Sequence, residues 1–228
     1  CKECYTGELC EKGSKALVFN GGINGYAKSH DGAQPTSTTN GTISVNNGGL
    51  DAITSCFWIK TEHTAQRPTV LSYAVSKQTN EFIIYFSSSK IAVWLKENND
   101  LSTGVEVSDG KWHHICITWK SSDGSVETYN NGVSRNKQSG FVAGKSIEPY
   151  GLWIIGQDQD KFGGGFEQRD AFNGCLTAVN VWNRVLNSTE ISTLASQKCG
   201  LGMQGNYKPY KDFDPQGDVQ VVEPSCCN

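Results

Sequence analysis

Short strand-like segments recur along this chain, and turn sequences rich in Gly, Asn and Asp separate them. Two of the expected strands are 55–60 and 113–119. Within them, at residues 56–60 and 115–119, bulky residues alternate with smaller or polar ones, which is the two-residue period of a half-buried strand. The pairs Asp109-Gly110 and Asp123-Gly124 are typical of hairpin turns. Many short strands at this spacing predict an all-β fold, a two-sheet antiparallel jelly-roll sandwich. The other expected strands are 16–19, 69–74, 82–87, 91–95, 126–129, 152–155 and 176–182.

One short helix is expected at residues 188–197. Asn187 is placed to cap its N-terminus, Glu190 lies in its first turn and Gly200 follows its end. Beyond Gly200 the sequence is polar and contains prolines, which predicts an extended tail. We therefore expect a cysteine-rich N-terminal segment at 1–15, a jelly-roll domain at 16–204 and an extended C-terminal tail ending in cysteines at 205–228.

The bulk properties exclude several classes of protein. A net charge of −3 argues against nucleic acid or an anionic membrane as the main partner. No apolar run approaches the roughly 18 residues that a membrane span requires. The chain starts at Cys1 and shows no signal peptide, so we expect a mature or trimmed product.

Nine cysteines are a high count for a chain of 228 residues, and they indicate disulfides formed in an oxidising compartment. The spacing Cys1-x-x-Cys4 could be half of a zinc site, but no second such pair or suitably spaced His completes it. An odd total leaves at least one thiol for an intermolecular bond or for the reduced state. Two glycosylation sequons, at Asn40 and Asn187, agree with a secreted protein. Because Asn187 is also the expected helix cap, Asn40 is the better acceptor.

The segment 156–170 concentrates acidic residues around three glycines, Gly163 to Gly165. Glycines permit positive φ angles, so the chain can turn sharply there and bring its carboxylates together. Converging carboxylates suit Ca²⁺, which accepts six to eight oxygen ligands in flexible geometry. The alternative is a solvated acidic turn, in which Lys161 and Arg169 offset the charge. The four carboxylates are Asp158, Asp160, Glu167 and Asp170.

The chain resembles the pentraxin family. Residues 114–121 carry the His, Cys, Ser/Thr and Trp of the family signature at His114, Cys116, Thr118 and Trp119. The resemblance continues through 73–81, 156–167 and 179–186, and covers roughly residues 16–200. It implies a jelly roll of the lectin and laminin-G type, secreted, assembled into homo-oligomers such as cyclic pentamers, and binding ligands through calcium.

The resemblance also implies specific cysteine pairs and calcium ligands. Cys56 would pair with Cys116, and Cys10 with Cys199 as in long pentraxins. One or two Ca²⁺ ions would be held by Asp158, the backbone carbonyl of Gln159, Asp160, Glu167, Asp170 and Asn80. Thr79 stands where the family has an Asp beside Asn80, so the two ions are expected to bind with unequal affinity.

A ligand pocket beside the calcium ions is expected at Tyr85, Trp94 and Glu81. In short pentraxins this region recognises phosphocholine, and an aromatic face can hold a quaternary ammonium by cation–π contact. The alternative is that both rings belong to the core. Exposed carbohydrate, phosphate monoesters and phosphocholine all fit such a calcium-dependent site.

We therefore expect a secreted, lectin-like pattern-recognition protein of innate immunity that binds carbohydrate or phosphate groups through Ca²⁺. An enzyme is not expected. Adjacent His113 and His114 would point to opposite faces of a strand, and no Gly-x-Ser-x-Gly motif appears. The alternative function is a structural or adhesive extracellular module, in which the terminal cysteines link chains through disulfides and the domain binds protein partners.

Overall fold

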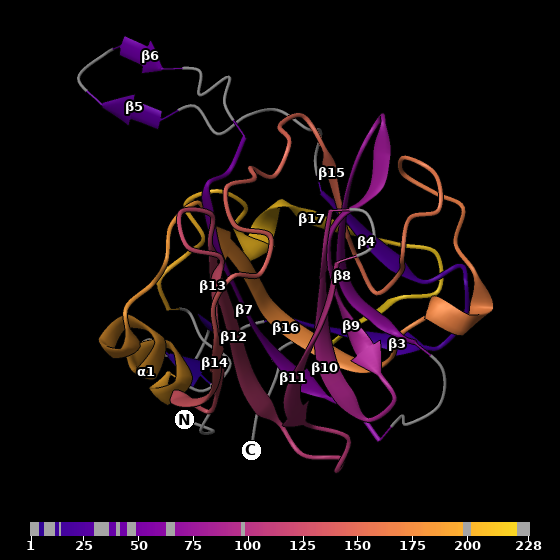
Figure 1. The fold of residues 1–228 in the computed structure, drawn as a ribbon. Coiled ribbons are helices and arrows are strands. Elements are labelled where there is room, and N and C mark those ends of the chain that lie inside the picture. Colours follow the sequence, from indigo (N-terminus) through magenta and orange to yellow (C-terminus); the bar gives the residue numbers. More distant parts are fainter. Residues whose placement is uncertain are drawn as a thin grey trace.

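The computed structural model describes residues 15–29, 49–62, 67–96, 99–197 and 202–222. It also describes the backbone of four short strands, β1 (Tyr5–Thr6), β2 (Lys12–Gly13), β5 (Ser37–Thr39) and β6 (Thr42–Ser44). Two seven-stranded antiparallel sheets face each other across these residues (Figure 1). The expected two-sheet β sandwich with one short helix is confirmed.

Sheet I is the sheet that the helix covers. In spatial order it contains β14 (Val133–Gln138), β13 (Ser125–Asn130), β12 (His113–Lys120), β7 (Ala52–Lys60), β16 (Asn173–Trp182), β3 (Ala16–Asn20) and β18 (Gln220–Val222).

Sheet II is the sheet that the acidic segment covers. In spatial order it contains β11 (Asp100–Glu106), β10 (Lys90–Leu95), β9 (Gln78–Ser87), β8 (Thr69–Val75), β15 (Leu152–Ile155), β4 (Tyr26–Ser29) and β17 (Phe213–Gln216).

The main core lies between the sheets, where alternate side chains of each strand meet. On β9, Phe82, Ile84 and Phe86 point into this core. The intervening Ile83 and Tyr85 belong to a separate cluster on the other face of the strand. The half-buried interpretation of residues 55–60 and 113–119 is wrong, because β7 is buried on both faces through Ile59 and β12 is buried on both faces from His114 to Trp119. Both strands lie in sheet I, and α1 covers part of its outer face.

The helix α1 (Ser188–Ser196) covers part of the outer face of sheet I. Its Ile191 and Leu194 pack in one cluster with Trp182 and with the disulfide between Cys56 and Cys116. That disulfide, implied by the family resemblance, joins residues that lie opposite each other on β7 and β12. Figure 1 shows α1 and the acidic segment on opposite sides of the sandwich. Within the described residues, no helix is long and apolar enough to cross a membrane.

Asn187 caps α1 as expected. Its side-chain oxygen accepts a hydrogen bond from the Glu190 amide at 2.9 Å, and its own amide donates to the Glu190 carboxylate at 2.9 Å. This reciprocal capping box satisfies two amides at the start of the helix. Glycosylation of Asn187 stays a prediction. Asn40 and the expected Cys10–Cys199 pair lie outside the described residues.

The sequence expected to form a tail adds a strand to each sheet. Residues 213–216 pair with β4, and residues 220–222 pair with β3. These two strands, together with β4, β11 and β14, were not expected from the sequence. Four of the five lie at sheet edges, where one side of a strand faces solvent and the apolar pattern weakens.

Candidate metal centre

The acidic segment begins where β15 ends and folds back along the outer face of sheet II. Its reversal is a tight turn in which Lys161 and Gly164 exchange backbone hydrogen bonds of 3.0 and 2.9 Å. Gly163 and Gly165 adopt φ angles of 74° and 77°, as the sequence predicted. A Cβ at Gly165 would lie 2.8 Å from the Lys161 nitrogen, so this position requires glycine.

Two buried glutamines fix the segment that carries the aspartates. The Gln157 amide donates to the carbonyl oxygens of Gly22 and Gly25 at 2.9 and 3.0 Å. The Gln159 amide donates to the Leu152 carbonyl at 3.0 Å, and its oxygen accepts from the Gly163 amide at 2.9 Å. Sequence reasoning missed these roles. The signal was the alternation Gln-Asp-Gln-Asp, in which the buried members hold Asp158 and Asp160 toward the outside.

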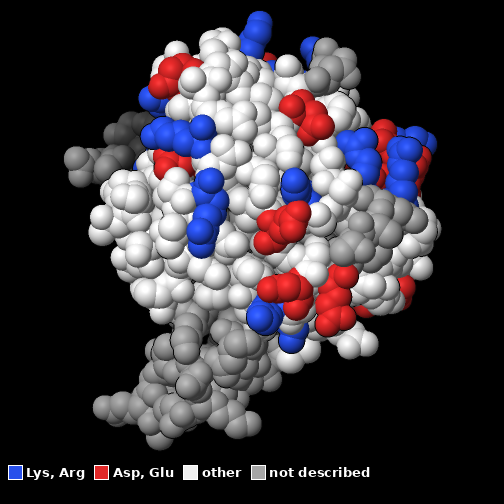
Figure 2. All heavy atoms as spheres, turned by 60° about the horizontal axis from the view of Figure 1, so that its bottom comes forward, with Lys and Arg blue, Asp and Glu red and all other residues white. Residues whose placement is uncertain are grey.

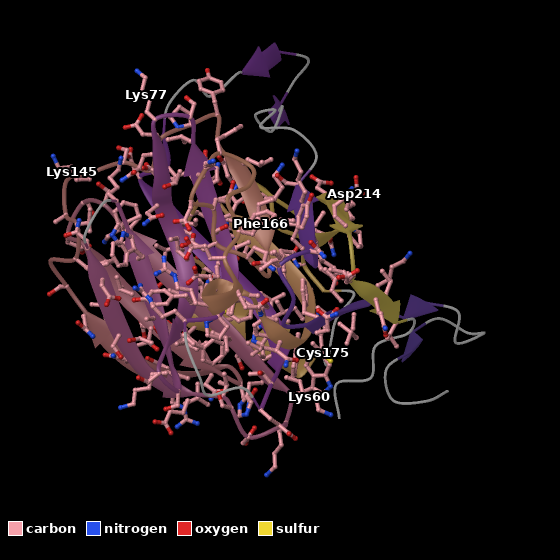
Figure 3. The ribbon with its side chains drawn as sticks, turned by 90° about the vertical axis from the view of Figure 1, so that its right-hand side faces the viewer. Lys60, Lys77, Lys145, Phe166, Cys175 and Asp214 are labelled. Carbon is pink, nitrogen blue, oxygen red and sulfur yellow. A yellow bond between two sulfur atoms is a disulfide. The ribbon has the colours of Figure 1, made fainter. Side chains whose placement is uncertain are left out.

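Three carboxylates converge on this segment. Asp160, Glu167 and Asp170 each place one oxygen within 4.8 Å of the others. Asp170 lies in the short 3₁₀ helix η1 (Gln168–Asp170) and is only 6% exposed. The returning arm is held by Phe166, whose ring centroid lies 4.8 Å from that of Tyr26 on β4 (Figure 3). The expected convergence is confirmed for these three carboxylates.

Asp158 is not a member of this three-carboxylate cluster, but it lies within its electrostatic field. Burial, together with the negative charges of Asp170 and Asp160, raises the pKa of Asp158 to about 6. Burial, with repulsion from Asp160, also raises the pKa of Asp170. The ionised carboxylates are therefore destabilised by one another, and a cation among them would relieve that repulsion.

Arg169 partly neutralises the cluster, as the alternative of a solvated acidic turn requires. Its Nε lies 2.9 Å from a Glu167 oxygen and 3.2 Å from an Asp170 oxygen. The guanidinium is mostly exposed, so these contacts are screened by water and weak. A divalent ion binding the same oxygens would compete with Arg169.

The donor set fits calcium. The converging atoms are carboxylate oxygens on a flexible surface segment, and hard oxygen donors in irregular geometry suit Ca²⁺ better than zinc, which favours nitrogen and sulfur. Asn80 lies near the start of β9, where its side-chain oxygen is 3.4 Å from the Thr79 hydroxyl. No described contact joins Asn80 to the three carboxylates, so its role in metal binding stays a prediction.

The expected ligand pocket divides into two places. Tyr85 and Trp94 lie together on the outer face of sheet II, apart from the main core. Glu81 instead lines a separate cavity of 1070 Å³ between the β8–β9 turn and residues 142–150. There its carboxylate lies 2.9 Å from the Lys96 nitrogen and accepts a hydrogen bond from the Glu148 amide. In Figure 3 Lys77 and Lys145, which line that cavity, lie far from Phe166.

Comparison with known proteins decides the family. Residues 35–221 match the family model described as the Pentaxin family. The chain belongs to the pentraxin family. Neuronal pentraxin-2 of Mus musculus is 37% identical over 163 residues, which are 72% of this chain and 38% of the relative. Neuronal pentraxin-1 of Homo sapiens is 36% identical over 145 residues, 64% of this chain and 34% of the relative.

The pentraxin fold is also found by structure comparison. The native heptameric SAP-like pentraxin from Limulus polyphemus superposes with a TM-score of 0.78 at 25% identity, covering 94% of this chain and 97% of that one. Against the two neuronal pentraxins, by contrast, this chain spans less than two fifths of the relative's length.

Charges on the face shown in Figure 2 are mixed. Basic and acidic side chains are interspersed among neutral ones there.

Proposed function

We propose that this pentraxin is a secreted binding protein, not an enzyme, which recognises carbohydrate or phosphate groups through bound calcium and so acts in pattern recognition. The observation that carries the proposal is the convergence of three carboxylate oxygens within 4.8 Å on one outer face of the sandwich. Membership of a family of calcium-dependent binding proteins supports the same conclusion.

Asp160, Glu167 and Asp170 would form the centre of the calcium site. Asp158, the backbone carbonyl of Gln159 and Asn80 would complete it, for one ion or for two of unequal affinity. Calcium bound there would supply positive charge and open coordination positions for the oxygens of a ligand.

The protein's own contribution is to hold these oxygens in place before the ion arrives. The Gln157 side chain anchors the segment to the loop between β3 and β4, the Gln159 side chain anchors it to sheet II, and Gly165 allows its sharp return. Fixing the segment in advance lowers the ordering cost of binding. Arg169 would leave Glu167 and Asp170 as the ion binds, because the two cations compete for the same carboxylates.

Calorimetric titration of the intact protein with CaCl₂ tests this proposal. Wild type should bind calcium, and Asp160→Ala should weaken binding by at least about tenfold, because one charged ligand is lost. Asp123→Ala is the matched control, since Asp123 lies in the β12–β13 turn beside Lys120. A glycan and phosphate-ester array with calcium and with EDTA then identifies the ligand class. Absence of calcium binding by wild type would overturn the proposal.

A second candidate function is covalent assembly into an adhesive homo-oligomer, which Cys175 favours. Among the described cysteines Cys175 alone is free, and it lies half-buried on β16, opposite Lys60 on β7 (Figure 3). Electrophoresis in SDS with and without reductant tests this assembly. A ladder that collapses on reduction supports it, and a single monomer band in both lanes contradicts it. Cys175→Ser shows whether Cys175 takes part.

A further inference from the structure

The aromatic pair on the outer face of sheet II is already covered by a cation of the protein itself. The Arg67 guanidinium carbon lies 4.8 Å from the centroid of the Tyr85 ring and 5.6 Å from that of Trp94. Both distances lie within the range of cation–π attraction. The face that could hold a quaternary ammonium is thus occupied by Arg67.

The platform beneath Arg67 is built rigidly. Tyr85 is 3% exposed, and its hydroxyl donates to an Asp100 oxygen 2.6 Å away, on the far side of β10. Trp94 lies directly opposite Asp100 in the pairing of β10 with β11. Because the rings are held by the sheet and by this hydrogen bond, they fix the position of the guanidinium that stacks on them.

Arg67 also adjoins the acidic segment. Its backbone amide donates to the Arg169 carbonyl at 3.2 Å, which ties it to η1 next to Asp170. The positive charge of Arg67 acts to lower the pKa values of Asp158 and Asp170 against the larger effect of burial, so its field reaches both carboxylates. A side-chain hydrogen bond links the exposed Arg67 guanidinium to Tyr85. Within the described chain, no carboxylate lies at ion-pair distance from the guanidinium, so its other hydrogen-bond donors are open to a ligand.

We propose that Arg67 determines the ligand class of this site: it selects a phosphate monoester that carries no cationic group. The phosphate oxygens would face both the carboxylate-held calcium and the Arg67 guanidinium. This inference rests on the proposed calcium function. A guanidinium presents donors in a planar fork that matches phosphate, whereas it repels a quaternary ammonium brought to the same rings.

Two probes that share a phosphate but differ in charge test this inference. Ethyl phosphate and phosphocholine are titrated by calorimetry into the full chain at saturating calcium. Wild type should bind ethyl phosphate at least as tightly as phosphocholine. Arg67→Ala should weaken the binding of ethyl phosphate by about tenfold, which is the expected effect of losing a hydrogen bond between charged groups. The affinity for phosphocholine should rise relative to that for ethyl phosphate, because the substitution uncovers the two rings.

Two variants separate charge from shape and from general damage. Arg67→Lys should restore part of the ethyl phosphate affinity, because it keeps the charge but loses the fork. Arg135→Ala is the matched control, since Arg135 is exposed on β14 of the other sheet. Calcium titration of Arg67→Ala without phosphate is a further readout. Removing a positive charge near Asp158 and Asp170 should leave calcium affinity unchanged or higher, whereas structural damage would lower it.

The outcomes distinguish this inference from the proposed function. Phosphocholine binding wild type tenfold more tightly than ethyl phosphate would overturn the role of Arg67, as would an equal change for both probes in Arg67→Ala. If wild type binds calcium but neither probe, the phosphate assignment is wrong and the calcium site stands. Arg67-dependent binding of ethyl phosphate that persists in EDTA would support Arg67 and contradict the calcium function.

Discussion

The side-chain amide of Gln159 donates to the carbonyl oxygen of Leu152 at 3.0 Å, and this hydrogen bond joins the acidic segment to the last strand before it. The same side chain accepts from the Gly163 amide at 2.9 Å. A single buried glutamine thus links sheet II, the aspartates on either side of it and the glycine turn that follows.

Replacing this glutamine should loosen the site and the fold together. Gln159→Leu leaves the Leu152 carbonyl and the Gly163 amide without their partner, and each unsatisfied buried group costs about 1–3 kcal/mol. We expect a lower free energy of unfolding in urea and weaker calcium binding by calorimetry. Gln216→Leu, at an exposed position on β17, is the control and should change neither. Unchanged calcium affinity in Gln159→Leu would show that the segment keeps its shape without this anchor.

Asp158→Asn should make the metal-free protein more stable at neutral pH. The pKa of Asp158 in the folded protein is about 6, above the ordinary 3.8, so its charged form destabilises the fold at pH 7.5. A shift of this size corresponds to roughly 2–3 kcal/mol. The destabilisation by the Asp158 charge is absent below pH 3.8, develops as the pH rises from 3.8 to 6, and is complete above pH 6. The gain in stability from Asp158→Asn should therefore shrink toward pH 4. Urea unfolding in EDTA at pH 7.5 and 4.5 measures it.

The same Asp158→Asn variant should bind calcium more weakly, because it loses a negative charge near the cluster. Higher stability joined to lower affinity is the signature of a site that is strained until its ion binds. A variant that is less stable than wild type at pH 7.5 would contradict this interpretation. Asp218→Asn, exposed in the β17–β18 turn, serves as the control.

Removing Arg169 should strengthen calcium binding. The guanidinium contacts Glu167 and Asp170, so the ion must displace it. Since exposed ion pairs of this kind contribute up to about 1 kcal/mol, Arg169→Gln should tighten binding by a factor of about two to five. The gain should fall at high salt, which already screens the arginine. Calorimetry at 50 mM and 500 mM NaCl would reveal this, and a loss of affinity would mean that Arg169 orients the carboxylates.

His114 should make the fold sensitive to acid. Burial lowers its pKa to about 4, and its Nδ1 has no hydrogen-bond partner within the described structure. The unfolded chain, with a pKa near 6.5, binds the proton more readily, so stability is complete above pH 6.5 and falls as pH drops toward 4. His114→Phe should remove this part of the pH dependence, about 2–3 kcal/mol between pH 7 and 4.5. Urea unfolding at both values measures the difference, and parallel curves would disprove it.

Local patterns predicted most of the fold. The strands at 113–119 and 152–155 follow from alternation or a short apolar run, and the α1 cap follows from Asn187 and Glu190, which satisfy each other three residues apart. The edge strands β14, β17 and β18 were missed because they are largely exposed and carry no alternating apolar pattern. Their pairing with neighbouring strands, rather than their own pattern, places them in the sheets.

The acidic segment could also be predicted from the sequence, since its glycines and carboxylates are close in sequence and their convergence needs only a turn. The sequence did not predict which side chains from other strands lie beside it. Glu81 and Tyr85 lie four residues apart on β9, but the pairing of β8 with β9 shifts register between Tyr73 and Val75. Because of this irregularity, the two-residue period of a strand does not predict the direction of the Glu81 side chain.

The sequence by itself determined the sandwich, the helix, the Cys56–Cys116 pair through the family signature, and the convergence of three carboxylates. These depend on residues near one another in the chain or on a motif with fixed offsets. Only the tertiary structure brought Arg67 over Tyr85 and Trp94, because that contact joins three segments across sheet II. The physical reason is that hydrophobic periodicity and turn residues act locally along the chain. The contact of Arg67 with the two aromatic rings depends instead on strand order and register.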